Sequence, residues 1–329
     1  MKPRLLVIEL WGIGDLIIAS PFLREASRAY DVTLLAQAYA EEMRPYFWPE
    51  VSVLPFRMPW TVHRGKYRLH RWPWPGLSRL VWRMRRNRFD ATVSARWDPR
   101  DDLVMWLSGA RQRIGFPRMG SGFLQTTSLT RPDPIAHRHE RWRVIGECLG
   151  LELAPINKVV TPVSRRAGKV IIHSGAGKLL RVWPLDRFQG LAARLRSAGY
   201  EVAVSCDPEQ SGWWKDHGES EVTVPVSLPG LLELLSQAGV FIGNDSGPGH
   251  VAGYVGVPTF TLFGPQVPEW FVPLHPQAEW IEGTPCPYKP CFDYCEFSDP
   301  FCLTGILEVL VWERVKQFVQ RHLDPASSS

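Results

Sequence analysis

Short apolar runs alternate along the chain with longer segments of helical periodicity. Near the N-terminus, apolar runs at 5–10, 32–36 and 51–55 predict strands, and residues 16–30 predict a helix between the first two. Pro21 predicts that this helix either kinks or restarts there with Ser20 as its cap. Strands and helices that alternate in this order are typical of a parallel, doubly wound sheet.

The same rhythm returns after the polar stretch 161–168. Strands are predicted at 169–173, 201–206, 240–243 and 259–263, and helices at 185–198, 230–238 and 248–255. Further predictions are strands at 91–95 and 112–115, a last helix at about 304–322, and a frayed tail at 325–329. Because 329 residues suffice for two domains, we expect two α/β domains at 1–160 and 161–329.

Composition places the chain among ordinary globular proteins. It is 45% hydrophobic and 22% charged, which excludes disorder, collagen-like repeats and coiled coil. No apolar run is as long as the ~18 residues that predict a transmembrane helix. Glu9 interrupts the first apolar run too early for a signal peptide, and six cysteines are too few for a disulfide scaffold. We therefore expect a cytoplasmic protein.

Positive charge is unevenly distributed. Residues 57–118 contain fifteen basic and four acidic residues, a local charge of +11, and the other 23 basic and 29 acidic residues give −6. Within this tryptophan-rich insertion, segment 77–89 has apolar residues near helical spacing and arginines mostly elsewhere. A basic amphipathic helix beside tryptophans is typical of a membrane-surface anchor. An ordinary solvated helix is the alternative, and no recognised nucleic-acid-binding motif accompanies the charge.

Two glycine turns resemble nucleotide motifs without matching them. Gly12 and Gly14 could open a dinucleotide-binding turn, but Ile17 occupies the third glycine position and Asp15 would repel a pyrophosphate. Gly177-Lys178 could end a P-loop, but Ile172 replaces its first glycine and Leu179 its Ser or Thr. Neither nicotinamide redox chemistry nor nucleotide hydrolysis is supported.

A more specific turn follows the strand predicted at 240–243. It reads Asn-Asp-Ser-Gly-Pro-Gly-His from 244 to 250, and Pro248 suits the first position of a helix. The backbone amides at 246–249 would then face an anion at the helix N-terminus, with His250 beside them. Asp245, Ser246, Gly247 and His250 are therefore candidate ligands of a diphosphate. The alternative is a plain loop in which Asp245 caps the helix.

A second anion-binding turn follows the strand predicted at 169–173. Ser174 and Gly175 are small enough for a close backbone approach, and Lys178 and Arg181 precede a Trp-Pro helix start. Arg181 could hold phosphate oxygens bidentately, with Lys178 as a point charge. A solvated basic loop is the alternative. Because both turns follow strand ends in the second half, they indicate a nucleotide-diphosphate ligand.

These turns, together with Gly14-Asp15 and Phe263-Gly264-Pro265, resemble glycosyltransferase family 9, the lipopolysaccharide heptosyltransferase family. The resemblance runs from about residue 5 to 306 and is weakest at 56–150. It implies a GT-B architecture, in which two Rossmann-like, doubly wound domains face a central cleft and the second binds the donor. It also implies inverting, metal-independent transfer of heptose, usually from ADP-heptose, to a lipopolysaccharide-type or other cell-envelope acceptor.

The resemblance also implies roles for single residues. Asp15 matches the proposed catalytic base, with Gly12 and Gly14 on the acceptor side. Arg181 stands where a phosphate-binding lysine is common, and Glu209 matches a position that contacts the nucleoside in some members. Glu9 replaces a residue that is basic in many members. These two departures bear on donor specificity more than on the reaction.

Other functions remain as alternatives. The same fold could serve a sugar transferase acting on a soluble secondary metabolite, a sugar-nucleotide epimerase, or a non-catalytic sugar-nucleotide-binding protein. Asp15 argues against binding alone, because a binding protein needs no base. The expected partners are a nucleotide-sugar donor, an anionic lipid-linked or envelope glycan acceptor and the inner face of the cytoplasmic membrane, with no nucleic acid.

Four cysteines lie close together near the C-terminus, at Cys286, Cys291, Cys295 and Cys302. They lack the C-x2-C spacing that structural zinc sites favour. The resemblance implies that the cysteine cluster is not accidental, because many family members carry a similar cluster late in the chain. A structural zinc or iron ion is one interpretation, and packing thiols or a disulfide are the other. Cys148 and Cys206 are expected to be core residues.

Overall fold

The computed structural model describes residues 2–61, 68–156, 168–291 and 294–324. The chain divides into two compact units, Met1–Pro155 and Ile156–Ser329, which are described one at a time. The boundary expected at 160/161 and the tail expected at 325–329 lie outside the described residues. None of the described helices is long and apolar enough to cross a membrane.

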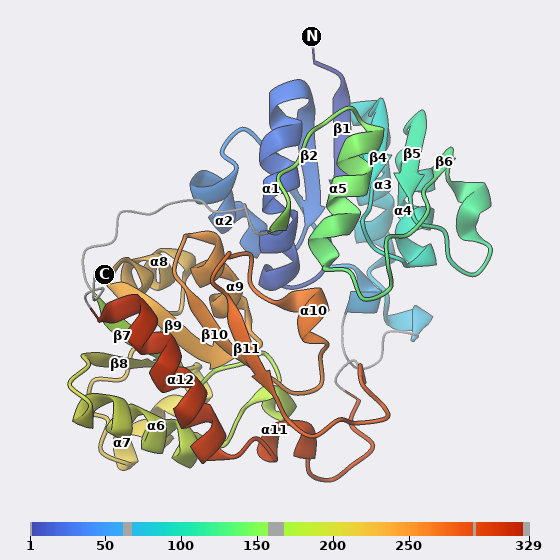
Figure 1. The fold of residues 1–329 in the computed structure, drawn as a ribbon. Coiled ribbons are helices and arrows are strands. Elements are labelled where there is room, and N and C mark those ends of the chain that lie inside the picture. The colour runs from blue at the N-terminus through green and yellow to red at the C-terminus, as the bar shows by residue number, and fades with distance from the viewer. Residues whose placement is uncertain (1, 62–67, 157–167, 292–293, 325–329) are drawn as a thin grey trace. The chain divides into compact units, whose positions relative to one another are not determined.

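Unit 1 is built on a parallel sheet in the order β3-β2-β1-β4-β5-β6 (Figure 1). Its strands are β1 (Arg4–Ile8), β2 (Asp31–Ala36), β3 (Ser52–Pro55), β4 (Ala91–Val93), β5 (Gln112–Gly115) and β6 (Thr127–Ser128). Its helices are α1 (Ile13–Ala29), α2 (Tyr39–Phe47), α3 (Trp74–Asn87), α4 (Pro99–Ser108) and α5 (Arg138–Cys148). Helix α1 contacts α2 and α5, whereas α3 contacts α4, as expected for a doubly wound sheet.

The apolar runs form strands because both faces of the sheet are covered. Leu5, Leu6, Val7 and Ile8 of β1 are all 0% exposed, which is typical of a central parallel strand. Strand β1 pairs with β2 on one side and with β4 on the other. The predicted strands of this half are confirmed to within two residues at each end.

Helix α1 runs unbroken through Pro21, so of the two predicted alternatives the restart at that residue is excluded. The Ser20 hydroxyl donates to the Leu16 carbonyl at 2.8 Å, as it does inside a helix, and accepts from Trp48 Nε1. Ser20 therefore ties α1 to the residue that follows α2, and the expectation that it caps a second helix was wrong.

Unit 2 is built on a parallel sheet in the order β11-β10-β9-β7-β8. Its strands are β7 (Lys169–His173), β8 (Val202–Ser205), β9 (Ala238–Asn244), β10 (Thr259–Phe263) and β11 (Glu279–Glu282). Its helices are α6 (Leu185–Ser197), α7 (Ser211–Asp216), α8 (Leu228–Ser236), α9 (Gly247–Tyr254), α10 (Pro268–Phe271), α11 (Phe301–Thr304) and α12 (Glu308–Leu323). A hydrophobic core joins β7, β9 and β10 to α6 and α12.

The single last helix expected at 304–322 is two helices, α11 and α12. The Ile306 carbonyl between them accepts hydrogen bonds from Trp183 Nε1 at 3.0 Å and from Arg187 Nη1 at 2.8 Å. Leu307 then takes an extended conformation as the N-cap of α12. These two long-range contacts fix the break, and the local sequence does not reveal them.

Candidate functional site

The strand order of each sheet reverses at its centre, and the predicted site residues follow the strands on either side of that point. In unit 1 the reversal lies between β1 and β4, and in unit 2 between β7 and β9. Open α/β sheets bind ligands beside the carboxyl ends of the strands at such a switch point. Asp15 follows β1, Ser174 to Arg181 follow β7, and Asp245 follows β9.

Asp15 lies in the first turn of α1, with Gly12 as the N-cap and Gly14 in the same turn. Its Oδ2 accepts the Gly12 amide at 3.3 Å, and its Oδ1 lies 3.2 Å from Nη1 of Arg96. The side chain keeps 26% of its surface exposed. Asp15 therefore caps the helix and still presents a carboxylate to solvent, so the capping interpretation and the catalytic one are compatible.

Arg96 comes from the other side of the switch point, on the loop after β4. Its Cζ lies 4.3 Å from the centre of the Trp11 ring, so the guanidinium is held between an aromatic face and the Asp15 carboxylate. The sequence reasoning did not single out Arg96, although its position after a strand could have indicated it.

Glu9 is 3% exposed and accepts the Trp11 amide at 3.3 Å. Burial and then the neighbouring charge of Asp15 raise the pKa of Glu9 to about 8. At neutral pH this carboxyl is therefore mostly protonated. Burial also raises the pKa of Tyr39, whose hydroxyl donates to the Trp11 carbonyl.

In unit 2 the two predicted anion-binding turns meet. Nη1 of Arg181 lies 3.2 Å from Oδ2 of Asp245, and the Trp183 amide donates to Oδ1 of Asn244 at 3.0 Å. These contacts join the loop after β7 to the end of β9 across the switch point. Lys178 is half-buried next to the short 3-10 turn Leu179–Arg181.

Helix α9 begins at Gly247, and its N-cap is Ser246. Asp245 does not cap it, so that alternative was wrong: the carboxylate contacts Arg181 and lies 3.8 Å from Nε2 of His250. Oγ of Ser246 and Nδ1 of His250 are buried without a hydrogen-bond partner in the described part of the chain. Buried polar atoms normally have a partner, so these two atoms are candidates for contact with a polar ligand.

His173, which ends β7, is a third group of this kind that the sequence reasoning did not name as a site residue. It is 1% exposed, its Nδ1 lies 3.0 Å from the Ser205 hydroxyl, and no described residue bonds its Nε2. Burial lowers its pKa to about 4, so the ring is neutral. Asp207 lies 3.8 Å from that nitrogen, and burial raises its pKa.

The remaining predicted residues of unit 2 have different surroundings. The Ser174 hydroxyl is buried, donates to Gln210 at 2.8 Å and accepts from Trp214 at 2.9 Å, so it serves the fold. A Cβ on Gly175 would lie 2.4 Å from the Asp207 carboxylate, which explains the glycine. Glu209 is exposed on the turn after β8.

Comparisons with known proteins relate the chain to one family of glycosyltransferases. The sequence profile of glycosyltransferase family 9 (heptosyltransferase) matches residues 149–300. Lipopolysaccharide heptosyltransferase 1 of Pseudomonas aeruginosa is 24% identical over 314 residues, which cover 88% of this chain and 86% of that protein. The chain is related to the family 9 glycosyltransferases.

Solved structures confirm the GT-B fold. A family 9 glycosyl transferase from Veillonella parvula has a TM-score of 0.75 at 18% identity, and 98% of each chain is covered. The E. coli heptosyltransferase WaaC, solved with ADP, has a TM-score of 0.71 at 15% identity, with 96% of this chain and 99% of that one covered. Because the identities are low, these likenesses show the fold alone.

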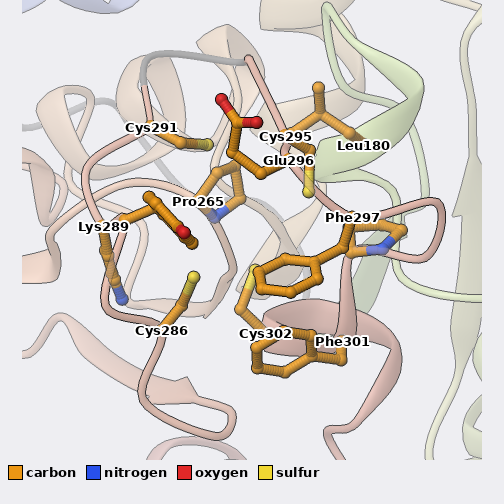
Figure 2. Close-up of a pocket in the computed structure, with 12 residues that line it drawn as sticks. Leu180, Pro265, Cys286, Lys289, Cys291, Cys295, Glu296, Phe297, Phe301 and Cys302 are labelled. Atoms are coloured by element: carbon orange, nitrogen blue, oxygen red, sulfur yellow. The ribbon is translucent and has the colours of Figure 1, made fainter.

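The late cysteines surround one small pocket in unit 2, together with Phe297 and Phe301 (Figure 2). None of the six cysteines, all within the described residues, forms a disulfide. Burial, then the neighbouring thiols, raise the pKa of Cys302 to about 11. Across the described residues, which omit 292–293, no three potential ligands are gathered as a metal site. Cys206 is buried as expected, whereas Cys148 is exposed, so that expectation was wrong.

Helix α3 carries much of the positive charge of the basic insertion. Residues 62–67 of that insertion lie outside the described residues. Leu80 and Met84 pack into the core of unit 1, which is the packing expected from the alternative interpretation, an ordinary solvated helix. The opposite face exposes Trp74 (53%), Trp82 (57%) and arginines, and Arg86 lies 5.2 Å from the Trp82 ring centre. The helix contains no acidic residue.

Proposed function

We propose that this chain is an inverting glycosyltransferase that moves a heptose from ADP-heptose to a lipopolysaccharide-type or other anionic cell-envelope acceptor. The observation that carries the proposal is the group of unpartnered buried atoms at the switch point of unit 2, on Ser246, His250 and His173, beside Arg181. The relatives support its specificity, since one is a lipopolysaccharide heptosyltransferase and one was solved with ADP.

In the proposed reaction, Asp15 accepts the proton of the acceptor hydroxyl as its oxygen attacks the anomeric carbon of the donor. The bond from that carbon to the diphosphate oxygen breaks, and a single displacement inverts the anomeric centre. Arg181, Lys178 and the N-terminus of α9 stabilise the negative charge on the departing nucleoside diphosphate. Because these groups supply the positive charge, the proposed mechanism needs no catalytic metal.

A ligand panel followed by a transfer assay tests this function. We expect ADP-sugars to raise the unfolding temperature more than GDP-, UDP- or dTDP-sugars, and ADP-heptose to give a heptosylated product with a lipopolysaccharide-type acceptor. Stabilisation by UDP-sugars alone would overturn the donor assignment. Free nucleotide released without an acceptor would indicate an epimerase, and transfer confined to soluble acceptors would indicate secondary metabolism.

We also propose that the protein works in the cytoplasm, at the inner face of the cytoplasmic membrane, through the exposed face of α3. Tryptophan side chains favour the headgroup region, and arginines are attracted to anionic lipid. The exposed Trp74 and Trp82 combine both properties on a helix without acidic residues. This supports a lipid-linked acceptor over a soluble one.

For the late cysteines we propose a structural rather than a catalytic role. Four thiols around one pocket are the donor set of structural zinc and iron sites, but their arrangement does not bring three of the described ligands together. Elemental analysis of the purified protein tests this directly. About one zinc or iron per chain would support an ion here, whereas six titratable thiols and no metal would leave packing thiols as their role.

A further inference from the structure

The side chain of Asn244 joins the two ends of the loop between β7 and α6. Asn244 is the last residue of β9 and is 1% exposed. Its Nδ2 donates to the Ser174 carbonyl at 2.8 Å, and its Oδ1 accepts from the Trp183 amide at 3.0 Å. Ser174 begins the loop and Trp183 ends it, so a single side-chain amide holds both ends. We call residues 174–183 the donor loop.

Each end of the donor loop is also fixed by the core of unit 2. The Ser174 carbonyl accepts a second hydrogen bond from Nε2 of Gln210 at 3.2 Å, and the Ser174 hydroxyl bonds Gln210 and Trp214. The Trp183 ring is 0% exposed and lies edge-on to the Phe188 ring, with 5.0 Å between the ring centres. Both ends are therefore rigid, and the side chain that spans them sets how they are joined.

The middle of the donor loop is more open than its ends. A Cβ on Gly177 would meet no atom within 4 Å, and Leu179 is 85% exposed. Glycine adds backbone freedom that must be lost when the loop becomes ordered. The placement of Lys178 and Arg181 therefore depends on the fixed ends. A loop that is ordered before its ligand arrives also binds that ligand at a lower entropic cost.

The next residue, Asp245, contacts the same loop in a different way. Its carboxylate lies 3.2 Å from Nη1 of Arg181, a side chain that is 24% exposed. A diphosphate bound by Arg181 would compete with this contact. The bonds of Asn244 go to buried backbone groups, so a ligand at Arg181 leaves them in place. Of these two consecutive residues, Asp245 thus contacts the cation and Asn244 holds the backbone that carries it.

The chemistry of the two partners explains why the position holds asparagine. The Ser174 carbonyl needs a donor, and the Trp183 amide needs an acceptor. A primary amide presents one of each on the same carbon, whereas a carboxylate presents two acceptors and an alkyl group presents neither. Because the site is buried, a partner left without its bond would cost the full desolvation of a polar group.

We propose that Asn244 is a positioning residue for the donor, which it serves by holding the two ends of the donor loop together. The inference rests on the proposed transferase function for the identity of the ligand. Asn244 acts through the loop backbone, and the loop brings Lys178 and Arg181 to the diphosphate. Its replacement should therefore lower the affinity for the nucleotide and raise KM for the donor, while KM for the acceptor stays unchanged.

Asn244→Asp tests the proposal through its dependence on pH. A protonated carboxyl keeps one donor and one acceptor, as the amide does, whereas the ionised form has acceptors only and faces the Ser174 carbonyl. Burial opposes ionisation, so the defect should grow toward alkaline pH. In calorimetric titration with ADP, the variant should match the unmodified protein at about pH 5 and bind about tenfold or more weakly at about pH 9.

Two further variants complete the titration. Asn87→Asp, the same change at an exposed position at the end of α3, is the matched control and should follow the unmodified protein at every pH. Asn244→Leu has no polar atom to titrate and should weaken ADP binding equally at both pH values. Unfolded chains lower the stoichiometry of the titration, whereas a misplaced loop raises Kd at unchanged stoichiometry. A merely structural role is thereby distinguished from positioning.

Hydrogen exchange of the free chain gives a readout that needs no ligand. Relative to the unmodified protein at the same pH, Asn244→Asp should keep the protection of residues 174–183 at about pH 5 and lose it at about pH 9. If this loss is seen but no nucleotide binds the unmodified protein, the proposed donor fails and the role of Asn244 in holding the loop stands.

Two results would overturn the inference. One is an unmodified protein that binds ADP together with Asn244 variants that bind it equally well at every pH. The other is exchange of residues 174–183 that follows the unmodified protein in Asn244→Asp across the whole pH range.

Discussion

Each oxygen of the Asp15 carboxylate has its own neighbour in unit 1. Oδ2 accepts the amide of the N-cap residue Gly12, and Oδ1 contacts Arg96. The first contact holds the side chain at the start of α1, and the second keeps a positive charge beside it. Replacing the carboxylate by an amide retains the shape and one acceptor oxygen, but it removes the charge and the basicity.

Asp15→Asn is therefore expected to reduce kcat for transfer by about two to four orders of magnitude, which is the usual contribution of a general base. Donor affinity, measured by calorimetry, should change little, because the donor turns belong to unit 2. Asp186→Asn, an exposed change on α6, is the control and should keep both properties. A loss of donor affinity as large as the loss of activity would contradict the assignment of Asp15 as base.

The buried Glu9 carboxyl leads to a prediction about how the free energy of unfolding depends on pH. The unfolded chain loses the Glu9 proton near pH 4.5, but the folded protein keeps it until about pH 8. Between those values the folded state binds more protons, so this residue's contribution to the free energy of unfolding is full below about pH 4.5 and is lost as the pH rises to about 8. Glu9→Gln has no proton to lose and should escape this decline.

Thermal unfolding at several pH values checks the prediction. Relative to the unmodified protein, Glu9→Gln should gain several degrees in unfolding temperature as the pH rises through that window. Burial also raises the pKa of Asp101 to about 7, so this residue lowers stability over a similar pH range. Because Asp101 is present in both proteins, its effect drops out of the difference between them. Glu152→Gln, at an exposed position, should show a difference that does not vary with pH, and the same behaviour in Glu9→Gln would exclude a buried ionisable group.

Site residues were predictable where a short run of sequence carries the chemistry. Asp15, Arg181 and Asp245 each lie in a glycine-rich turn directly after an apolar strand, so a local pattern marks them. His173 has no such mark, because it is burial and the contact with Ser205, 32 positions away, that set it apart. Its role depends on contacts between distant segments, which spacing along the chain does not show.

Strands and helices likewise could be predicted only where a local sequence pattern marks them. Central strands such as β7 and β10 were predicted to the residue, because parallel strands buried on both faces are continuous apolar runs. Helix α5 was missed, because its buried face includes His139 and Arg141 and interrupts the apolar periodicity. Helix α3 was predicted because its two core residues and its arginines follow helical spacing, although it begins earlier, at Trp74.

The exposed basic face of helix α3 leads to a prediction about membrane binding. The unmodified protein should sediment with vesicles that contain anionic lipid at low salt, and much less at about 0.5 M salt. The double variant Arg83→Gln/Arg86→Gln should bind roughly thirtyfold more weakly, because each basic residue near the surface contributes about 1 kcal/mol. Trp82→Ala should weaken binding at both salt concentrations, because its contribution is not electrostatic.

Arg314→Gln/Lys316→Gln, on α12 of unit 2, removes the same charge from another exposed helix and is the matched control. If both double variants weaken vesicle binding equally, the interaction depends on net charge and not on α3. Failure of the unmodified protein to sediment at low salt would remove the membrane proposal.

At the scale of the whole molecule, charge and chemistry are divided between the two units. The basic insertion and Asp15 belong to unit 1, whereas the donor turns belong to unit 2. The sequence predicted this division because each half repeats the same strand and helix rhythm. It could not predict that the two donor turns are tied together by the Arg181–Asp245 contact, which joins residues 64 positions apart.

Hydrogen exchange measured along the full chain tests this division. With ADP, or whichever nucleotide the ligand panel selects, exchange should slow in the loop after β7 and in the first turn of α9. There the amides at the helix N-terminus would bond the diphosphate. Segments of unit 1 around α1 and α5 should show little change with the nucleotide. The Arg181→Gln variant should lose most of the nucleotide response. Nucleotide protection centred on α1 would contradict the assignment of the donor to unit 2, because the amides at the start of that helix face the Asp15 carboxylate, which would repel a diphosphate.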